Sequence, residues 1–102
     1  MTAKWRYRNR NVEQQIEQRA IQKALYTGDL STAVRYLQKI DELIKNIEAF
    51  PDMGQATGKK NCHYSVLGHS SPGEGDVLVW SWDGVELIGE GVYQCLPPEY
   101  ES

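Results

Sequence analysis

The spacing of apolar residues changes partway along this chain, and that change most constrains its fold. Between residues 33 and 47, apolar side chains recur at alternating intervals of four and three residues, at Ala33, Leu37, Ile40, Ile44 and Ile47. This spacing places them on one side of an α-helix. From Asp76 to Trp82 the chain is rich in valine and tryptophan, which is typical of a β-strand. Helices followed by strands predict an α+β fold.

A single domain is expected, because 102 residues suffice for one modest core. We expect an N-terminal basic arm and a helical hairpin that pack on a small C-terminal antiparallel β-sheet. The predicted parts are the basic arm (1–10), the helical hairpin (11–50), a linker (51–61), an antiparallel β-meander (62–98) and a tail (99–102).

Capping residues mark the ends of the two predicted helices. Asn11 can cap the first helix, and Gly28 can end it in a left-handed conformation. Asp29 or Ser31 then opens the second helix, which Pro51 ends. The sequence therefore predicts two helices joined by a short turn.

The segment from Ala24 to Leu37, ALYTGDLSTAVRYL, resembles the inter-helix turn of a tetratricopeptide repeat. The resemblance implies a helix-turn-helix unit. No second copy follows at the period of about 34 residues that such repeats have. A lone helical hairpin is therefore favoured over a repeat array, because a single repeat cannot bury both of its faces.

The apolar stripe of the second helix has two interpretations. It covers only about two heptads, which is short for an isolated coiled coil and favours packing on the first helix and the sheet. The alternative is a homodimer seam formed by the same residues, Ala33, Leu37, Ile40, Ile44 and Ile47. The first interpretation is favoured, and the second stays open.

The Asp-Gly pair at 83–84 predicts a two-residue β-hairpin turn. In that register Trp82 pairs with Val85, and Trp80 pairs with Leu87. One face of the sheet would then carry Leu78, Trp80, Trp82, Val85 and Leu87, and we expect the second helix to cover it. Flanking strands are expected at 62–67 and 92–96.

Charge is distributed unevenly along the chain. All eleven lysines and arginines lie at or before Lys60, where seven acidic residues give residues 1–60 a net charge of +4. Residues 61–102 contain seven acidic residues and no lysine or arginine, a net charge of −7, so the chain as a whole is at −3. Such an asymmetry bears on the choice of partner rather than on the fold.

In the arm, cationic residues alternate with aromatic or polar ones. Successive side chains of an extended segment point to opposite sides, so the cations would share one side and the aromatics the other. This predicts an extended arm or edge strand whose aromatic side chains pack inward. The predicted partner-binding residues are Lys4, Trp5, Arg6, Tyr7, Arg8 and Arg10. They are expected to dock on a protein or on the chain's own acidic half, or alternatively to contact phosphates and bases of a nucleic acid.

Four residues could bind a metal or act in catalysis, but their spacing is unsuitable. Cys62 and His63 are adjacent and would point to opposite faces of a strand, and together with His69 and Cys95 they form no Cys-x-x-Cys or His-x-x-x-His pair. Two buried free thiols and surface histidines are expected. We therefore expect no metal, no cofactor and no enzymatic activity.

The N-terminus has basic residues but no apolar run behind them, so it is not typical of a secretory signal. The apolar stretches are only a few residues long, whereas about 20 are needed to span a bilayer. A cytoplasmic protein without membrane contact is expected, and that location disfavours a disulfide between Cys62 and Cys95.

Three C-terminal segments, GEGDVLVW at 73–80, DGV at 83–85 and LPPE at 96–99, together resemble a small phage- and prophage-associated domain of unknown function. Members share a Val-Leu-Val-Trp-like strand, a turn and a closing Leu-Pro-rich tail. The chain departs from this pattern at Gln94-Cys95, where the family usually has a tryptophan and a proline. The resemblance implies a phage setting and brings no catalytic residues with it.

These features together favour an interaction protein. The hypothesis is a small, phage-encoded modulator that docks on a host enzyme, such as a nuclease or a defence complex, and inhibits or redirects it. The alternative is a nucleic-acid-binding accessory protein that uses the basic aromatic arm.

Overall fold

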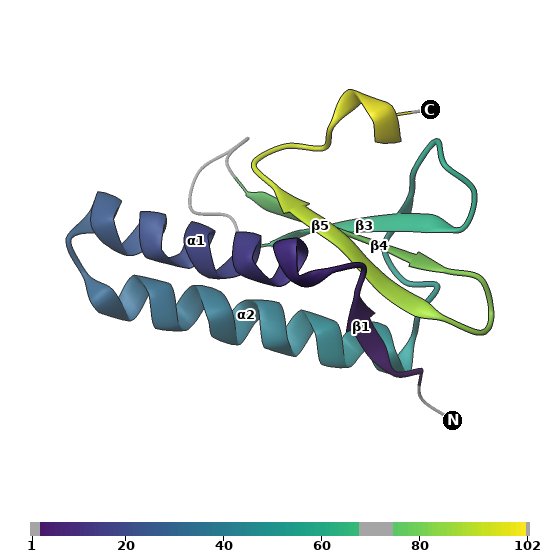
Figure 1. The fold of residues 1–102 in the computed structure, drawn as a ribbon, viewed down its shortest axis with the longest axis horizontal. Helices are drawn as coiled ribbons and strands as arrows, with labels where there is room; N and C mark the ends of the chain where they lie inside the picture. The colour runs from purple at the N-terminus through teal and green to yellow at the C-terminus, as the bar shows by residue number, and fades with distance from the viewer. Residues whose placement is uncertain (1–2, 68–74, 102) are drawn as a thin grey trace.

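The computed structural model describes residues 3–67 and 75–101. Within them, two helices form a hairpin beside a five-stranded mixed sheet of strand order β1-β5-β4-β3-β2 (Figure 1). In chain order the elements are β1 (Trp5–Tyr7), α1 (Arg10–Thr27), α2 (Leu30–Ala49), β2 (Gln55–Ala56), β3 (Cys62–Leu67), β4 (Asp76–Trp82), β5 (Leu87–Tyr93) and the 3-10 helix η1 (Pro98–Tyr100). The predicted α+β class and helical hairpin are confirmed.

Helix α1 begins earlier than predicted, because Asn9 rather than Asn11 is its N-cap. The Asn9 side chain accepts a hydrogen bond from the Val12 backbone N–H at 3.2 Å. Asn9 keeps the extended backbone of the arm before it, so the chain turns into the helix at this residue. Gly28 ends α1 as predicted, with a φ of 70° that favours glycine.

Helix α2 is capped by Asp29, one of the two predicted residues. The Asp29 carboxylate accepts a hydrogen bond from the Ser31 backbone N–H at 2.9 Å. The helix ends at Ala49, with Phe50 as the C-cap just before Pro51. Among the described residues, no helix has both the length and the apolar content that a membrane span needs.

Strands β3 and β4 have the predicted bounds and pair antiparallel, with Cys62 opposite Ser81. Two other boundaries differ. The predicted linker contains β2, which pairs with β3. The second strand of the predicted hairpin and the strand expected at 92–96 are replaced by one strand, β5, which ends at Tyr93 and whose glycines keep the extended conformation.

The β4–β5 register also differs from the prediction. Trp82 pairs with Leu87 instead of Val85, and Trp80 pairs with Gly89. The loop is longer because the Asp83 carboxylate accepts hydrogen bonds from the backbone N–H groups of Val85 and Glu86, at 2.8 and 2.7 Å. This local turn replaces the two-residue hairpin turn, and Val85 is left 83% exposed instead of facing the core.

A β-bulge interrupts the same strand pair. Trp80 lies opposite Gly89 and Val79 lies opposite Gly91, so Glu90 is the extra residue. One extra residue reverses the alternation of side chains, and Leu87 and Val92 therefore reach the same core although five positions separate them. The bulge thus keeps both ends of β5 in contact with the helices.

The basic arm forms strand β1, which pairs with β5 in parallel. The C-terminal strands β2 to β5 pair antiparallel as predicted, and β1 of the arm adds one parallel pair, so the sheet as a whole is mixed. Sequence patterns could not indicate the pairing because Trp5 and its partner Leu87 lie near opposite ends of the chain.

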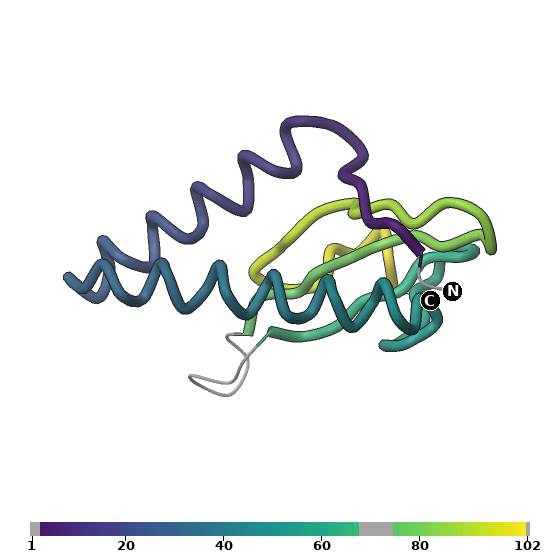
Figure 2. Tube along the Cα trace, turned by 90° about the horizontal axis from the view of Figure 1, so that it is seen from below, coloured from purple at the N-terminus to yellow at the C-terminus, as the bar shows by residue number. Residues whose placement is uncertain are grey.

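The main core lies between the hairpin and one face of the sheet (Figure 2). Ile40 and Ile47 of α2 share it with Leu78, Trp80 and Leu87 of the sheet. Trp80 is fully buried, and its indole Nε1 donates a hydrogen bond to the Pro51 carbonyl oxygen at 3.0 Å. Helix α1 contributes as well as α2, so two helices cover the face that one was expected to cover.

The chain's C-terminal segment covers the opposite face of the sheet. Tyr100 of η1 is 7% exposed and packs with Cys62, Val77 and Val79. Its carbonyl oxygen accepts a hydrogen bond from the Gly58 N–H at 2.7 Å. Within the predicted tail (99–102), Tyr100 thus packs on the sheet, because the apolar outer face of β3 and β4 needs cover.

One buried carboxylate joins the sheet to the middle of both helices. Asp76 is 2% exposed and accepts two hydrogen bonds from the Arg19 guanidinium, at 2.7 and 2.8 Å. It also accepts one from the Tyr36 hydroxyl at 2.6 Å, and Lys23 Nζ lies 3.6 Å away. Burial alone would raise the pKa of Asp76, but the hydrogen bonds from Arg19 and Tyr36 outweigh it and lower that pKa.

Candidate binding surfaces

The arm has the two-sided character predicted from its alternation. Lys4, Arg6 and Arg8 are exposed, whereas Trp5 and Tyr7 between them are partly buried and pack against the main core. Pairing with β5 holds this segment extended. The prediction of an edge strand with inward aromatics is confirmed, and its outward side is a row of cations.

Two of these cations form ion pairs with β5 and the loop before it. Arg6 Nη2 lies 3.3 Å from Glu86 Oε1 in an exposed pair. Arg8 donates two hydrogen bonds to Glu90, at 2.9 and 2.6 Å, and the Ser81 hydroxyl donates a third at 2.7 Å. Burial would raise the pKa of Glu90, but the hydrogen bonds from Arg8 and Ser81 lower it. The arm therefore docks on the chain's own acidic half.

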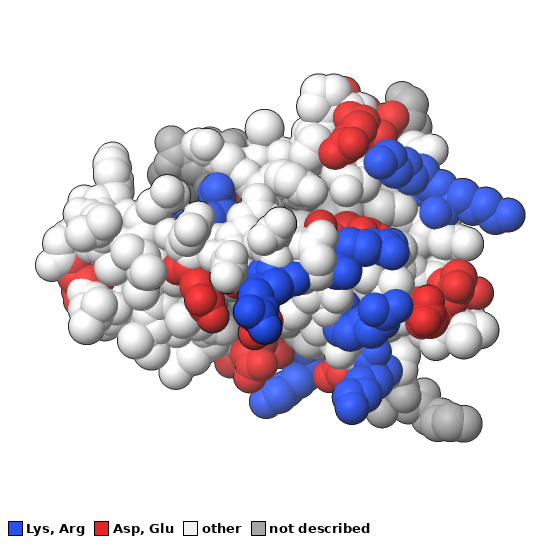
Figure 3. Space-filling model, in the orientation of Figure 1, with Lys and Arg blue, Asp and Glu red and all other residues white. Residues whose placement is uncertain are grey.

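The other two cations of the arm, Lys4 and Arg10, are exposed and have no ion-pair partner among residues 3–67 and 75–101. Figure 3 shows lysine and arginine side chains gathered over β1 and the start of α1, with acidic side chains between them. We call the exposed side of Lys4, Arg6, Arg8 and Arg10 the cationic row.

Trp5 is held in place by the sheet beneath it. A Cβ atom on Gly89 would overlap the Trp5 ring, so only glycine allows this close approach. The Trp5 backbone N–H donates to Glu48 Oε2 at 2.9 Å, and the ring meets Tyr7 edge-on at 5.8 Å. This packing leaves the cations, rather than the indole ring, as the part of the arm that a partner meets first.

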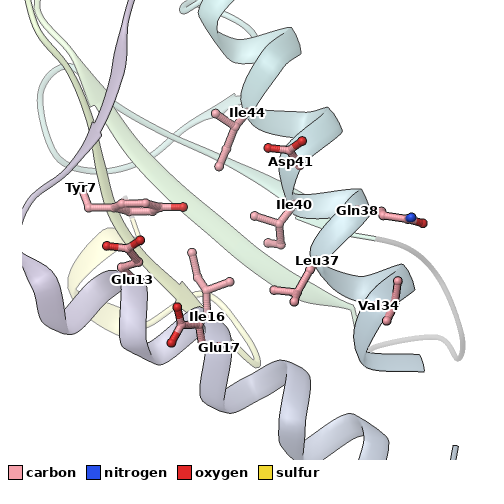
Figure 4. A pocket seen from close by; sticks show the side chains of 10 residues that line it. All are labelled: Tyr7, Glu13, Ile16, Glu17, Val34, Leu37, Gln38, Ile40, Asp41 and Ile44. Atoms are coloured by element: carbon pink, nitrogen blue, oxygen red, sulfur yellow. The ribbon is translucent and has the colours of Figure 1, made fainter. Parts of the chain in front are cut away.

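A second surface is an open groove of about 460 Å³ between α1 and α2, which Tyr7 closes at one end (Figure 4). We call it the hairpin groove. It is lined by Tyr7, Glu13, Ile16, Glu17, Val34, Leu37, Gln38, Ile40, Asp41 and Ile44. Sequence reasoning missed this groove, because its lining side chains come from β1, α1 and α2 and meet only in the folded chain.

The hairpin groove is acidic. Glu13, Glu17 and Asp41 line it, and no lysine or arginine does. Burial raises the pKa of Tyr7, and these three carboxylates raise it further. Lys45 lies 3.5 Å from Asp41 in an exposed pair one turn along α2, so this carboxylate is partly compensated.

The groove continues into an exposed apolar surface at the turn between the helices. Ile21, Leu25, Tyr26, Leu30 and Val34 are each more than half exposed, and Tyr26 reaches 94%. We call these five residues the turn-end patch. Val34 belongs to both surfaces, so the patch and the hairpin groove are contiguous.

The predicted homodimer seam is largely used inside the chain. Ala33, Ile40 and Ile47 are buried in the main core and cannot meet a second copy. Leu37 and Ile44 line the hairpin groove instead. Three of the five seam residues thus pack inside the chain, as the favoured interpretation predicted, and the homodimer alternative stays a prediction.

The thiols and imidazoles are dispersed. Cys62 is buried, and burial raises the pKa of its thiol, whereas Cys95 is exposed. The His63 ring stacks on Trp80 at 6.0 Å, and His69 lies outside the described residues. Within residues 3–67 and 75–101, no group of three or more histidine, cysteine or acidic residues could hold a metal ion.

Comparison of the chain with protein-family models, curated proteins and solved structures gave no match. The resemblance of residues 73–99 to a phage-associated domain therefore stays a prediction. Part of that stretch, residues 73 and 74, also lies outside the described residues.

Proposed function

We propose that this chain is a small protein-binding modulator that acts by occupying a surface of another protein. The observation that carries the proposal is the cationic row, which follows the edge strand β1 and continues to the start of α1. The resemblance at residues 73–99 suggests the setting: a phage-encoded protein that inhibits or redirects a host enzyme, such as a nuclease or a defence complex.

Preorganisation supports a binding role for the row. Arg6 and Arg8 are held by Glu86 and Glu90, yet their side chains are still 58% and 51% exposed. Ordering long side chains on binding costs about 0.5–1.5 kcal/mol each, and these two are already ordered. Arginine is also enriched among residues that dominate binding energy.

Catalysis has less support from the described surfaces. The hairpin groove combines aliphatic side chains with carboxylates that have no nucleophile or histidine beside them. The exposed thiol of Cys95 lies outside this groove. We therefore propose a binding protein rather than an enzyme.

Nucleic-acid binding through the same row is the alternative, because four exposed cations lie close together in the chain, three on or beside β1 and Arg10 at the start of α1. Two of them are already neutralised by Glu86 and Glu90. A phosphate backbone would have to compete with these carboxylates, and a net charge of −3 opposes its approach. A protein partner is favoured for this reason.

The test is affinity purification of the tagged chain from host lysate, with and without nuclease treatment, followed by mass spectrometry. A stoichiometric protein that survives nuclease treatment, and that is lost from the Lys4→Ala/Arg10→Ala variant, supports the proposal. Recovery of nucleic acid alone would favour the alternative.

The matched control is the Arg35→Ala/Lys39→Ala variant, which removes the same charge from exposed positions of α2. Neither residue takes part in a salt bridge among those the structure describes. If both variants lose or retain the partner equally, the cationic row is not its binding site.

A further inference from the structure

We propose that the hairpin groove and the turn-end patch together bind one amphipathic helix of a partner protein, a helix that carries lysine or arginine beside leucine or isoleucine. This site is separate from the cationic row, and the proposed function does not include it. The partner helix would lie along the hairpin and form a three-helix bundle with α1 and α2.

The two helices present one continuous face. On α1, Glu13, Glu17, Ile21 and Leu25 follow at four-residue intervals, and on α2, Leu30, Val34, Leu37, Asp41 and Ile44 follow at intervals of four and three. Such intervals keep side chains on one side of each helix. The antiparallel helices thus form a long face that is apolar at the turn and acidic near the sheet.

Within residues 3–67 and 75–101, no other element covers the turn-end patch, whose five side chains are all more than half exposed. The hairpin extends beyond the sheet at its turn, as both views show (Figures 1 and 2). Arg19, Lys23 and Tyr36 contact Asp76, and all of the turn-end patch except Ile21 lies on the turn side of these contacts along the hairpin. Leu25 and Leu30 are 76% and 78% exposed as a result. Contiguous exposed apolar side chains of this kind mark interaction sites.

Charge decides the chemistry of the occupant. Glu13 and Glu17 have no ion-pair partner among the described residues, and no basic residue lines the groove. A helix with leucines toward Ile16 and Leu37 brings its flanking side chains to these carboxylates. Lysine or arginine at those flanks pairs with them, whereas glutamate would be repelled.

A second copy of this chain fits the site less well. A two-fold contact presents the same surface on both sides, so neither copy would bring a cation to Glu13 or Glu17. Those carboxylates would lose water without gaining a partner. An amphipathic cationic helix of another protein can cover the apolar part of the face and pair with its carboxylates.

The experiment measures binding of the intact chain to a fluorescent leucine/lysine peptide of about the length of α1, 18 residues, by fluorescence anisotropy. Its leucines repeat at helical spacing. The control peptides are a leucine/glutamate version and a leucine/lysine version with scrambled order. Binding of the amphipathic leucine/lysine peptide alone is expected, because the other two lack either the charge or the apolar stripe.

Variants then locate the site. The Glu13→Gln/Glu17→Gln/Asp41→Asn variant is expected to bind about tenfold more weakly, since it loses the exposed ion pairs with the lysines of the peptide. The Glu42→Gln/Asp52→Asn/Glu101→Gln variant has the same net charge but retains the three carboxylates of the hairpin groove. It should bind the peptide normally. Leu37→Ala is expected to weaken binding by about tenfold, whereas Val85→Ala, which shortens an exposed apolar side chain of the β4–β5 loop, should not.

Three results would overturn the inference: no binding of the amphipathic peptide, equal binding by the two charge variants, or self-association of the chain that Leu25→Ala abolishes. Thermal melts of each variant show whether it is folded. The Lys4→Ala/Arg10→Ala variant should bind the peptide normally, so failure of this site and failure of the cationic row can be told apart.

Discussion

The two ends of the helical hairpin have similar apolar residues in opposite environments. Toward the sheet, Ile40 and Ile47 are 3% and 0% exposed. Toward the turn, Ile21, Leu25 and Leu30 are 57%, 76% and 78% exposed. Apolar spacing on a helix therefore shows which side needs cover, but not whether the same chain supplies it.

Asp76 marks the boundary between the two ends. Its carboxylate contacts Arg19 and Lys23 of α1 and Tyr36 of α2. On the sheet side of this boundary the helices pack on the sheet, whereas on the turn side Leu25 and Leu30 are largely exposed. The comparison leads to four predictions, which begin with the largest effect.

Removal of the boundary contact should have the largest effect. Asp76→Ala leaves Arg19 and the Tyr36 hydroxyl without their acceptor, and loss of one partner of a buried ion pair costs about 3–5 kcal/mol. Urea denaturation should show this decrease in the free energy of unfolding, and a smaller decrease for Asp76→Asn. Hydrogen exchange should also rise at the turn end, and unchanged exchange there would contradict the boundary role.

Truncation of apolar side chains should separate the two ends. Ile47→Ala creates a cavity in the main core and should destabilise the fold by about 2–4 kcal/mol. Leu25→Ala removes a similar side chain from the turn end and should change stability by no more than about 0.5 kcal/mol. If urea denaturation shows equal decreases in the free energy of unfolding for Ile47→Ala and Leu25→Ala, the side chains at the turn end are buried in solution.

Acid should weaken the sheet end selectively. The folded-state pKa values of Asp76 and Glu90 are both lowered, since hydrogen bonds to the ionised carboxylates outweigh burial. Their contribution to stability is complete above the unfolded-state pKa, about 4, and is lost as pH falls through the lower folded-state pKa. Thermal melts between neutral and acidic pH should show that the melting temperature decreases in acid. Asp76→Asn should make this decrease smaller.

The ion pairs of the arm should have the smallest effect. A double-mutant cycle of Arg8→Ala and Glu90→Gln should give a coupling energy of about 0.5–1 kcal/mol, because the contact is bidentate and Glu90 is mostly shielded from water. The cycle of Arg6→Ala and Glu86→Gln should give less than about 0.5 kcal/mol, because both side chains are more than half exposed. A larger coupling energy for Arg6 and Glu86 than for Arg8 and Glu90 would show that solvent exposure does not determine the strength of these ion pairs.

The candidate binding surfaces differ in how far the sequence could predict them. The cationic row was predictable, because alternation along Lys4, Arg6 and Arg8 is a local pattern. The hairpin groove was not, because Glu13 and Asp41 become neighbours only when α1 and α2 pack. The role of Asp76 was also hidden, since its partner Arg19 lies 57 residues away.

By itself, the sequence determined the types of the elements and most of their positions. Helical spacing, Gly28 and Asp29 define the hairpin, and β3 and β4 have the predicted bounds because caps and periodicity depend only on neighbouring residues. The tertiary structure decided the parallel pairing of β1, the β4–β5 register and which apolar residues are covered. These features depend on contacts between distant segments, whose free energies no local pattern records.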